Sequence, residues 1–255
     1  MRLATEHLPG RNAGALPFVL VHGWCCNREA MRPVAAAFPE RDRLLLDLPG
    51  HGASPPAQDL SIPAHAAAVL REAPARFLAV GHSMGGQVAL AMAASAPERV
   101  AGAVLLDPAH LLASDRAIAA GARLGAHLAA RPPSDIIAAF ARDQLFAPLA
   151  PEAAARFEQL VASMAATPAQ TARRQWECVL AWNADGGAAA ALAGLQVPVL
   201  AITAARSVNR LSDLARASGH VTTGQVAAAG HMVQFEAMPQ VEAMVRRWLA
   251  LNDPA

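Results

Sequence analysis

The sequence predicts an α/β fold with a mostly parallel central sheet flanked by helices. Short apolar runs of strand length alternate with longer stretches of helical periodicity along most of the 255 residues. The runs 18–21, 77–80 and 100–106 are continuously apolar, which is typical of parallel strands that are buried on both faces. The stretch 109–187 contains no strand-like run. The sequence therefore predicts one large α/β domain with an all-helical insertion.

The composition excludes several classes of protein. The chain is 54% hydrophobic and 16% charged, so it carries enough apolar side chains to bury a core and is not a disordered chain. Its 21 cationic side chains are all arginine, and they balance 20 acidic ones to a net charge of +1. No run of arginines could follow a nucleic-acid backbone, so no nucleic-acid partner is expected.

The sequence also indicates the compartment of the protein and the redox state of its cysteines. The chain has three cysteines, Cys25, Cys26 and Cys178, of which two are adjacent. An odd number with an adjacent pair suits a reducing compartment better than a disulfide framework, and the spacing is not that of metal ligands. Residues 1–7 lack an apolar signal core, and no run of eighteen apolar residues occurs. We therefore expect a soluble cytoplasmic protein without membrane contact.

The first third of the chain predicts alternating strands and helices. We expect an edge strand at 2–8, strands at 18–21 and 43–47, and helices at 28–38 and 61–73.

A strand, a sharp turn and a helix surround Ser83. The predicted strand 77–80 leads into Gly81-His82-Ser83-Met84-Gly85, and a helical pattern follows over 87–94. So tight a turn leaves little room two positions either side of its central residue, which explains the two glycines. The serine hydroxyl would be exposed at the apex, where the Met84 amide could meet a developing oxyanion. A G-x-S-x-G alone is a weak signal, and the flanking strand and helix give it weight.

In this setting the motif resembles the nucleophile elbow of the α/β-hydrolase family, of the serine esterase or lactonase type with a helical cap. The resemblance covers nearly the whole chain. It implies Ser83 as nucleophile, His231 on the loop after the last strand as general base, and the backbone amides of Trp24 and Met84 as oxyanion donors. The alternative for His231 is an ordinary surface histidine. The catalytic role is favoured because a serine hydroxyl with its ordinary pKa is a weak nucleophile and needs a neighbouring base.

Other polar residues near these motifs are expected to be structural. His22 precedes the turn that contains Trp24. The loop 47–54 resembles the family's D-x-P-G-x-G-x-S segment, so Asp47 and His51 should shape that loop without belonging to the triad.

The rest of the chain completes the predicted fold. Strands are expected at 100–106, 197–202 and 221–226, with a closing helix at 239–251. The insertion should contain helices at 114–130, 134–146, 151–166 and 168–182. The predicted core domain is thus 1–108 with 188–255, and 109–187 resembles the family's cap. Candidate pocket residues are Trp24, Phe140, Trp176, Trp182 and Met232, although aromatic side chains at helical spacing also serve as core.

The triad acid is the point where the chain departs from the usual family pattern. The loop after 197–202 carries no carboxylate at the expected place, and the nearest is Asp213, on the following helix, where it could pair with Arg206 or Arg210. A subset of the family takes its acid from the end of the preceding strand, which here is Asp107, 24 residues after Ser83. We therefore favour Asp107 as the acid and keep Asp213 as the alternative. The alternative for Asp107 is a structural role, in which it only caps the first turn of the insertion.

Together these features predict a hydrolase of carboxylic esters or lactones that needs no metal and no organic cofactor. The partner would be a small-molecule ester or lactone, and the oligomeric state stays open. A C–C bond hydrolase, a thioesterase or a cofactor-free haloperoxidase uses the same triad. A ligand-binding or signalling protein on the same scaffold, with little turnover, is the alternative from another class.

Overall fold

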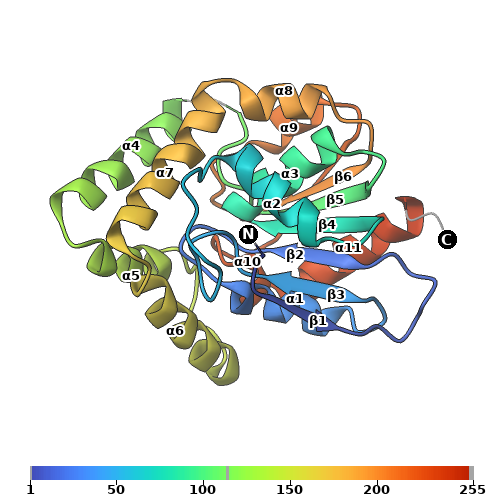
Figure 1. Cartoon of the computed structure of the whole chain (residues 1–255), viewed down its shortest axis with the longest axis horizontal. Coiled ribbons are helices and arrows are strands. Elements are labelled where there is room, and N and C mark those ends of the chain that lie inside the picture. The colour runs from blue at the N-terminus through green and yellow to red at the C-terminus, as the bar shows by residue number, and fades with distance from the viewer. Residues whose placement is uncertain (1, 113–114, 253–255) are drawn as a thin grey trace.

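A computed structural model of the chain describes residues 2–112 and 115–252. The predicted start of the helix 114–130 and the last three residues of the core domain lie outside the described residues. Within them, seven strands form one sheet in the order β1-β3-β2-β4-β5-β6-β7 (Figure 1). The strands are β1 (Thr5–Leu8), β2 (Phe18–Val21), β3 (Arg43–Leu46), β4 (Phe77–His82), β5 (Val100–Leu106), β6 (Val199–Thr203) and β7 (Val221–Gln225).

The sheet is mostly parallel. Edge strand β1 pairs with β3 in the antiparallel sense, and the remaining neighbours pair in parallel. Strand β2 shows why the central runs are continuously apolar: Val19 and Val21 face one hydrophobic core, whereas Phe18 and Leu20 face a second core across the sheet. Both faces are therefore buried, as the runs predicted.

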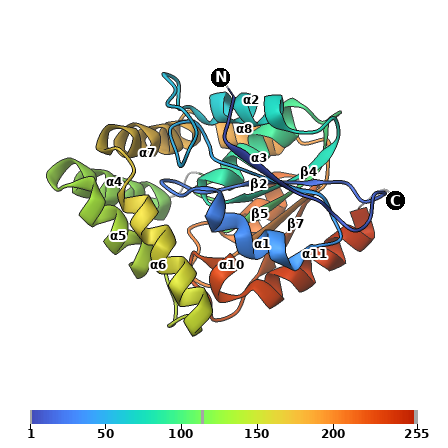
Figure 2. The same cartoon turned by 60° about the horizontal axis from the view of Figure 1, so that its bottom comes forward.

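Helices cover both faces of the sheet (Figure 2). One face carries α2 (Ile62–Glu72), α3 (Met84–Ser95) and α8 (Gly187–Ala193). The other carries α1 (Arg32–Ala37), α10 (Val233–Glu236) and α11 (Met238–Asn252). Helix α9 (Leu211–Ala217) packs beside β7. This is the α/β fold that the alternating pattern predicts.

Four further helices lie beyond one end of the sheet, on the left of Figure 1. They are α4 (Asp115–Ala130), α5 (Pro133–Asp143), α6 (Pro151–Ala165) and α7 (Ala169–Ala184), and they fall between β5 and β6 in the sequence. Trp176 of α7 joins the same apolar cluster as Val88 of α3. The inserted helices thus share one core with the sheet.

Local patterns missed three features of the fold. The predicted helix 28–38 begins as a 3₁₀ helix, η1 (Arg28–Met31), and continues as α1 only from Arg32, because the Asn27 side chain caps its start and Pro33 opens the next helix. Helix α8 has the sequence GAAAALA, which has no amphipathic period. Helix α10 has only four residues, too few to show a period.

Candidate active site

The elements meet at the carboxyl edge of the sheet, and Ser83 lies at the centre of that edge. Ser83 connects β4 to α3 with φ 56° and ψ −120°, a backbone conformation that side-chain-bearing residues rarely adopt. A Cβ on Gly81 would collide with the carbonyl of Gly85, and a Cβ on Gly85 would collide with the carbonyls of Val21 and His22. The two glycines therefore permit the turn that exposes Ser83.

Asp107 and His231 form a close pair beside Ser83. Nδ1 of His231 donates to Oδ2 of Asp107 over 2.6 Å, although 124 residues separate the two in sequence. Because Nδ1 carries the proton in this contact, Nε2 of His231 is left as the acceptor. The loop that carries His231 follows β7 and precedes α10, and its backbone N–H donates to the carbonyl of Gln144 over 2.9 Å.

The surroundings of Asp107 favour its ionised form. Burial alone would raise its pKa, but the hydrogen bond and charge of His231, the Ala204 amide and the Ser207 hydroxyl outweigh burial, so the pKa lies below its ordinary value. Oδ1 accepts from the Ala204 N–H over 3.0 Å. Asp107 itself has φ 35°, so its backbone is also held in the left-handed region.

His82, which occupies the first x of the G-x-S-x-G motif, hydrogen-bonds to the loop that carries His231. Its Nε2 donates to the backbone carbonyl of His231 over 2.9 Å, and the two rings lie 4.8 Å apart. Burial, together with the nearby His231, lowers the pKa of His82 to about 3. His82 is therefore a neutral donor at ordinary pH, and the sequence motif gave no sign of this contact.

The two proposed oxyanion residues flank the serine. Met84 is the first residue of α3 and is fully buried. Trp24 follows β2, and its indole Nε1 donates to the carbonyl of Ala172 on α7 over 2.9 Å. The ring lies 5.3 Å from Trp176 and 5.8 Å from Phe140. Trp24 thus reaches from the edge of the sheet into the inserted helices.

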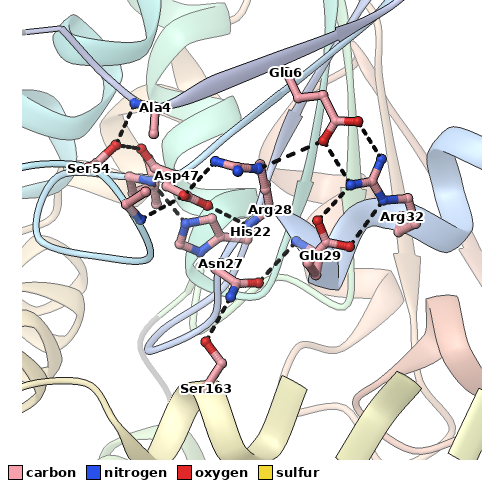
Figure 3. Close-up of polar contacts among 12 residues, drawn as sticks. Ala4, Glu6, His22, Asn27, Arg28, Glu29, Arg32, Asp47, Ser54 and Ser163 are labelled. Atoms are coloured by element: carbon pink, nitrogen blue, oxygen red, sulfur yellow. Dashed lines mark hydrogen bonds and ion pairs between the residues drawn. The ribbon is translucent and has the colours of Figure 1, made fainter. Parts of the chain in front are cut away.

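A polar network fixes the segment after Trp24 from the side of β3 (Figure 3). The buried carboxylate of Asp47 accepts from the N–H of Arg28 at 2.8 Å, from its guanidinium at 2.9 Å, and from the N–H of Ala53 at 2.9 Å. Nε2 of His22 accepts from the Leu48 N–H over 2.9 Å, and His51 packs against His22. Since Asp47, His22 and His51 do not line the cavity beside Ser83, their contacts organise the loops around it.

A cavity of about 470 Å³ connects the serine to the inserted helices. Among the residues that line it are Ser83, Asp107, His231, Trp24, Phe140, Trp176 and Met232. Trp182 does not line it, which corrects the sequence-based assignment: its indole packs over Gly187 at the start of α8. Asp213 is also absent from the lining and lies in the first turn of α9, where it pairs with Arg216 over 2.5 Å and not with Arg206 or Arg210.

The cavity also has polar residues that the sequence did not single out. His110 is 6% exposed, its ring lies against Trp176, and its Nδ1 has no hydrogen-bond partner among the described residues. Arg123, His127 and Asp143 of the insertion are exposed and line the cavity as well, so its rim is charged. No sequence motif marks these positions, because only the packing of α4 and α5 brings them to the cavity.

Among residues 2–112 and 115–252, no group of three or more His, Cys, Asp or Glu side chains could hold a metal ion. In the same residues, no helix combines the length and apolarity needed to cross a membrane.

A serine turn at the carboxyl edge of a parallel sheet, beside a histidine and carboxylate pair, is typical of α/β proteins with nucleophile chemistry. The model of the alpha/beta hydrolase family matches residues 18–244. The chain therefore belongs to the α/β-hydrolase family.

Comparison with curated proteins gives partial matches. The chain is 41% identical over 88 residues to the pimeloyl-(acyl-carrier protein) methyl ester esterase of Hamiltonella defensa subsp. Acyrthosiphon pisum, over 34% of each protein. It is 39% identical over 99 residues to the protein of that name from Pectobacterium carotovorum subsp. carotovorum, over 38% of this chain and 39% of the relative. The matches thus span well under half the length of these relatives.

Solved structures resemble the whole chain at lower identity. A thermophilic esterase from Thermogutta terrifontis superposes with a TM-score of 0.77 at 22% identity, covering 99% of this chain and 94% of that one. The enol-lactonase from Burkholderia xenovorans LB400 gives 0.75 at 20% identity, covering 97% and 96%. At such identity the likeness establishes the fold.

Proposed function

We propose that this protein is a serine hydrolase that cleaves a carboxylic ester or lactone through an acyl-enzyme on Ser83. The observation that carries the proposal is the 2.6 Å contact between His231 and Asp107 in the cavity that Ser83 also lines. The relatives named as methyl ester esterases support ester hydrolysis as the reaction class.

The first half of the reaction uses all three residues. Oγ of Ser83 attacks the ester carbonyl carbon while Nε2 of His231 takes the hydroxyl proton. The resulting imidazolium is stabilised by the Asp107 carboxylate on Nδ1. The amides of Trp24 and Met84 stabilise the negative oxygen of the tetrahedral intermediate.

The second half returns the enzyme to its starting state. Collapse of the intermediate breaks the bond to the leaving alkoxide, which takes the proton from Nε2 of His231 and departs as an alcohol. Water then attacks the acyl group on Ser83, with His231 again accepting the proton. His231 returns that proton to Oγ of Ser83 as the acid leaves, and a lactone gives the hydroxy acid by the same steps, its alcohol staying attached to the acyl chain.

We further propose that 109–187 serves as a cap that sets substrate size. Trp24, Phe140, Met164 and Trp176 give the cavity an apolar interior, and its volume of about 470 Å³ suits acyl or aromatic groups of modest size. Uncharged esters and lactones of short to medium length should therefore be preferred over dicarboxylic or phosphorylated ones, despite the charged side chains at the rim.

A ligand-binding protein with little turnover is the alternative function. It would be favoured if His231 had no carboxylate partner, and the loop after β6 carries none at the usual place. A carboxylate within 2.6 Å of His231 weakens it, because the base then has the partner that catalysis needs.

The decisive experiment combines turnover with covalent labelling. The protein should hydrolyse p-nitrophenyl acetate or butyrate, and a fluorophosphonate should add one adduct to its intact mass. Ser83→Ala should lose both properties and keep its melting temperature. Turnover or labelling that persists in Ser83→Ala would contradict the nucleophile assignment.

A further inference from the structure

Three hydrogen bonds join the segment 24–27 to the inserted helices. The indole of Trp24 donates to the carbonyl of Ala172 over 2.9 Å. The hydroxyl of Thr167 donates to the carbonyl of Cys25 over 3.2 Å. The side-chain amide of Asn27 donates to the Ser163 hydroxyl over 2.7 Å, as Figure 3 shows. Three of the four residues of the segment are thus attached to α6, α7 or the turn between them, Cys25 through its backbone and Trp24 and Asn27 through their side chains.

The segment has a conformation that it would not hold without such support. Cys25 has φ 56°, a left-handed conformation that is strained for a residue with a side chain. Arg28 anchors the far end of the segment on Asp47. Within the segment the Cys26 N–H donates to the carbonyl of Gly23 over 3.2 Å, and the contacts with the insertion add to this turn in opposing relaxation of Cys25.

We propose that Thr167 and Ser163 are positioning residues for catalysis, which hold the peptide units after Trp24 so that the Trp24 amide meets the oxyanion. The inference rests on the proposed function, because it takes Trp24 as an oxyanion donor. The insertion then has two roles: it encloses the substrate, and its docked position completes the oxyanion site. Neither residue lines the cavity, so Thr167 acts through the backbone carbonyl of Cys25 and Ser163 acts through the side chain of Asn27.

The test removes one hydroxyl and keeps the shape of the side chain. Thr167→Val should lower kcat/KM for p-nitrophenyl butyrate about tenfold, part of the about 10²- to 10³-fold cost of losing a whole oxyanion donor. Thr167→Ser retains the hydroxyl and should stay within about threefold of the original protein. Thr171→Val, four residues on in α7, is the matched control, because the Thr171 hydroxyl makes no hydrogen bond within the described residues.

A second readout separates positioning from general loosening of the cavity. An alkyl boronic acid forms a tetrahedral, anionic adduct with a serine and so occupies the oxyanion site, whereas a neutral alcohol of similar size does not. In Thr167→Val the Ki of the boronic acid should rise by the factor by which kcat/KM falls, and the Ki of the alcohol should stay unchanged. Ser163→Ala should show the same split.

The outcomes distinguish this inference from the proposed function. If Ser83→Ala is inactive and Thr167→Val matches Thr171→Val in kcat/KM, the positioning role is wrong while the hydrolase stands. Equal rises in both Ki values would also overturn it, since they would indicate a damaged cavity. Retained turnover in Ser83→Ala would instead remove the proposed function itself.

Discussion

At the scale of single residues, two residues of the candidate active site have a positive φ, in the left-handed region. Ser83 and Asp107 have φ 56° and 35°, and neither is glycine. Such conformations persist only where surrounding contacts enforce them. For Asp107 these contacts are its own N–H, which donates to the carbonyl of Ile202 over 2.7 Å, and its carboxylate, which meets Ala204 and His231. The strain at Asp107 therefore goes with a carboxylate aimed at the His231 ring.

Asp107→Asn should separate the catalytic acid from a structural residue. The amide keeps the shape of the side chain but cannot stabilise the imidazolium, so kcat should fall by about 10⁴ with an unchanged melting temperature. Steady-state assays on p-nitrophenyl esters and a thermal melt would measure both quantities. Asp213→Asn is the control: it alters only exposed contacts, with Arg216 and Ser212, and should stay within about threefold of the original activity. The opposite order of the two variants would refute the assignment of Asp107.

At the scale of elements, the first turn of α3 packs so closely on the end of β2 that Gly85 has no room for a side chain. Gly85 in the first turn of α3 lies against the carbonyls of Val21 and His22 at the end of β2. These are backbone atoms in the middle of the sheet and cannot rotate away as a flexible side chain could. The close approach keeps the N-terminus of α3 beside the segment that leads from β2 to Trp24.

Gly85→Ala should therefore destabilise the protein by about 3 kcal/mol or more, because the methyl group forces apart two elements that are packed through backbone. The free energy of unfolding from urea titration would test this. Gly219→Ala adds the same methyl group where a Cβ meets nothing within 4 Å, so it should leave stability within about 0.5 kcal/mol. Equal stabilities of the two variants would mean that α3 and the end of β2 can separate without cost.

At the scale of the whole molecule, buried neutral histidines link the sheet edge to the insertion. The rings of His22, His51 and His65 follow one another at 5.3 and 6.4 Å, and His65 hydrogen-bonds to Gln175 of α7 over 2.8 Å. Burial lowers the pKa of each, and that of His65 falls to about 4. The folded protein therefore resists protonation at sites that the unfolded chain protonates near pH 6.5.

Stability should accordingly fall on acidification. Between the unfolded pKa of 6.5 and the folded value of about 4 for His65, the unfolded state binds more protons, so stability decreases as the pH falls. Each such histidine contributes up to about 1.4 kcal/mol per pH unit. Urea midpoints at pH 7.5, 6.0 and 5.0 should therefore decline, and His65→Gln should decline less steeply. A midpoint that does not change across this range would contradict the buried neutral state.

Sequence alone predicted most of the fold and named several of the residues that meet at the candidate site. The strands β2, β4 and β5 follow directly from apolar runs, since burial on both faces leaves no room for polar side chains. The G-x-S-x-G turn marked Ser83, because its glycines reflect a local steric need that any sequence with this turn must meet. The end of β5 marked Asp107 as a candidate, although the same pattern left Asp213 open.

Only the tertiary structure decided which distant groups meet. The contact of Asp107 with His231, the hold of His82 on the His231 loop, and the links from Ser163 and Thr167 to the segment 24–27 all join residues far apart in the chain. The position of Trp182 outside the cavity and the charged rim of the cavity were unpredictable for the same reason. Helical periodicity identifies the apolar face of a helix but not the element against which that face packs. The physical reason is that local sequence sets backbone conformation, whereas side-chain partners depend on the packing of the whole chain.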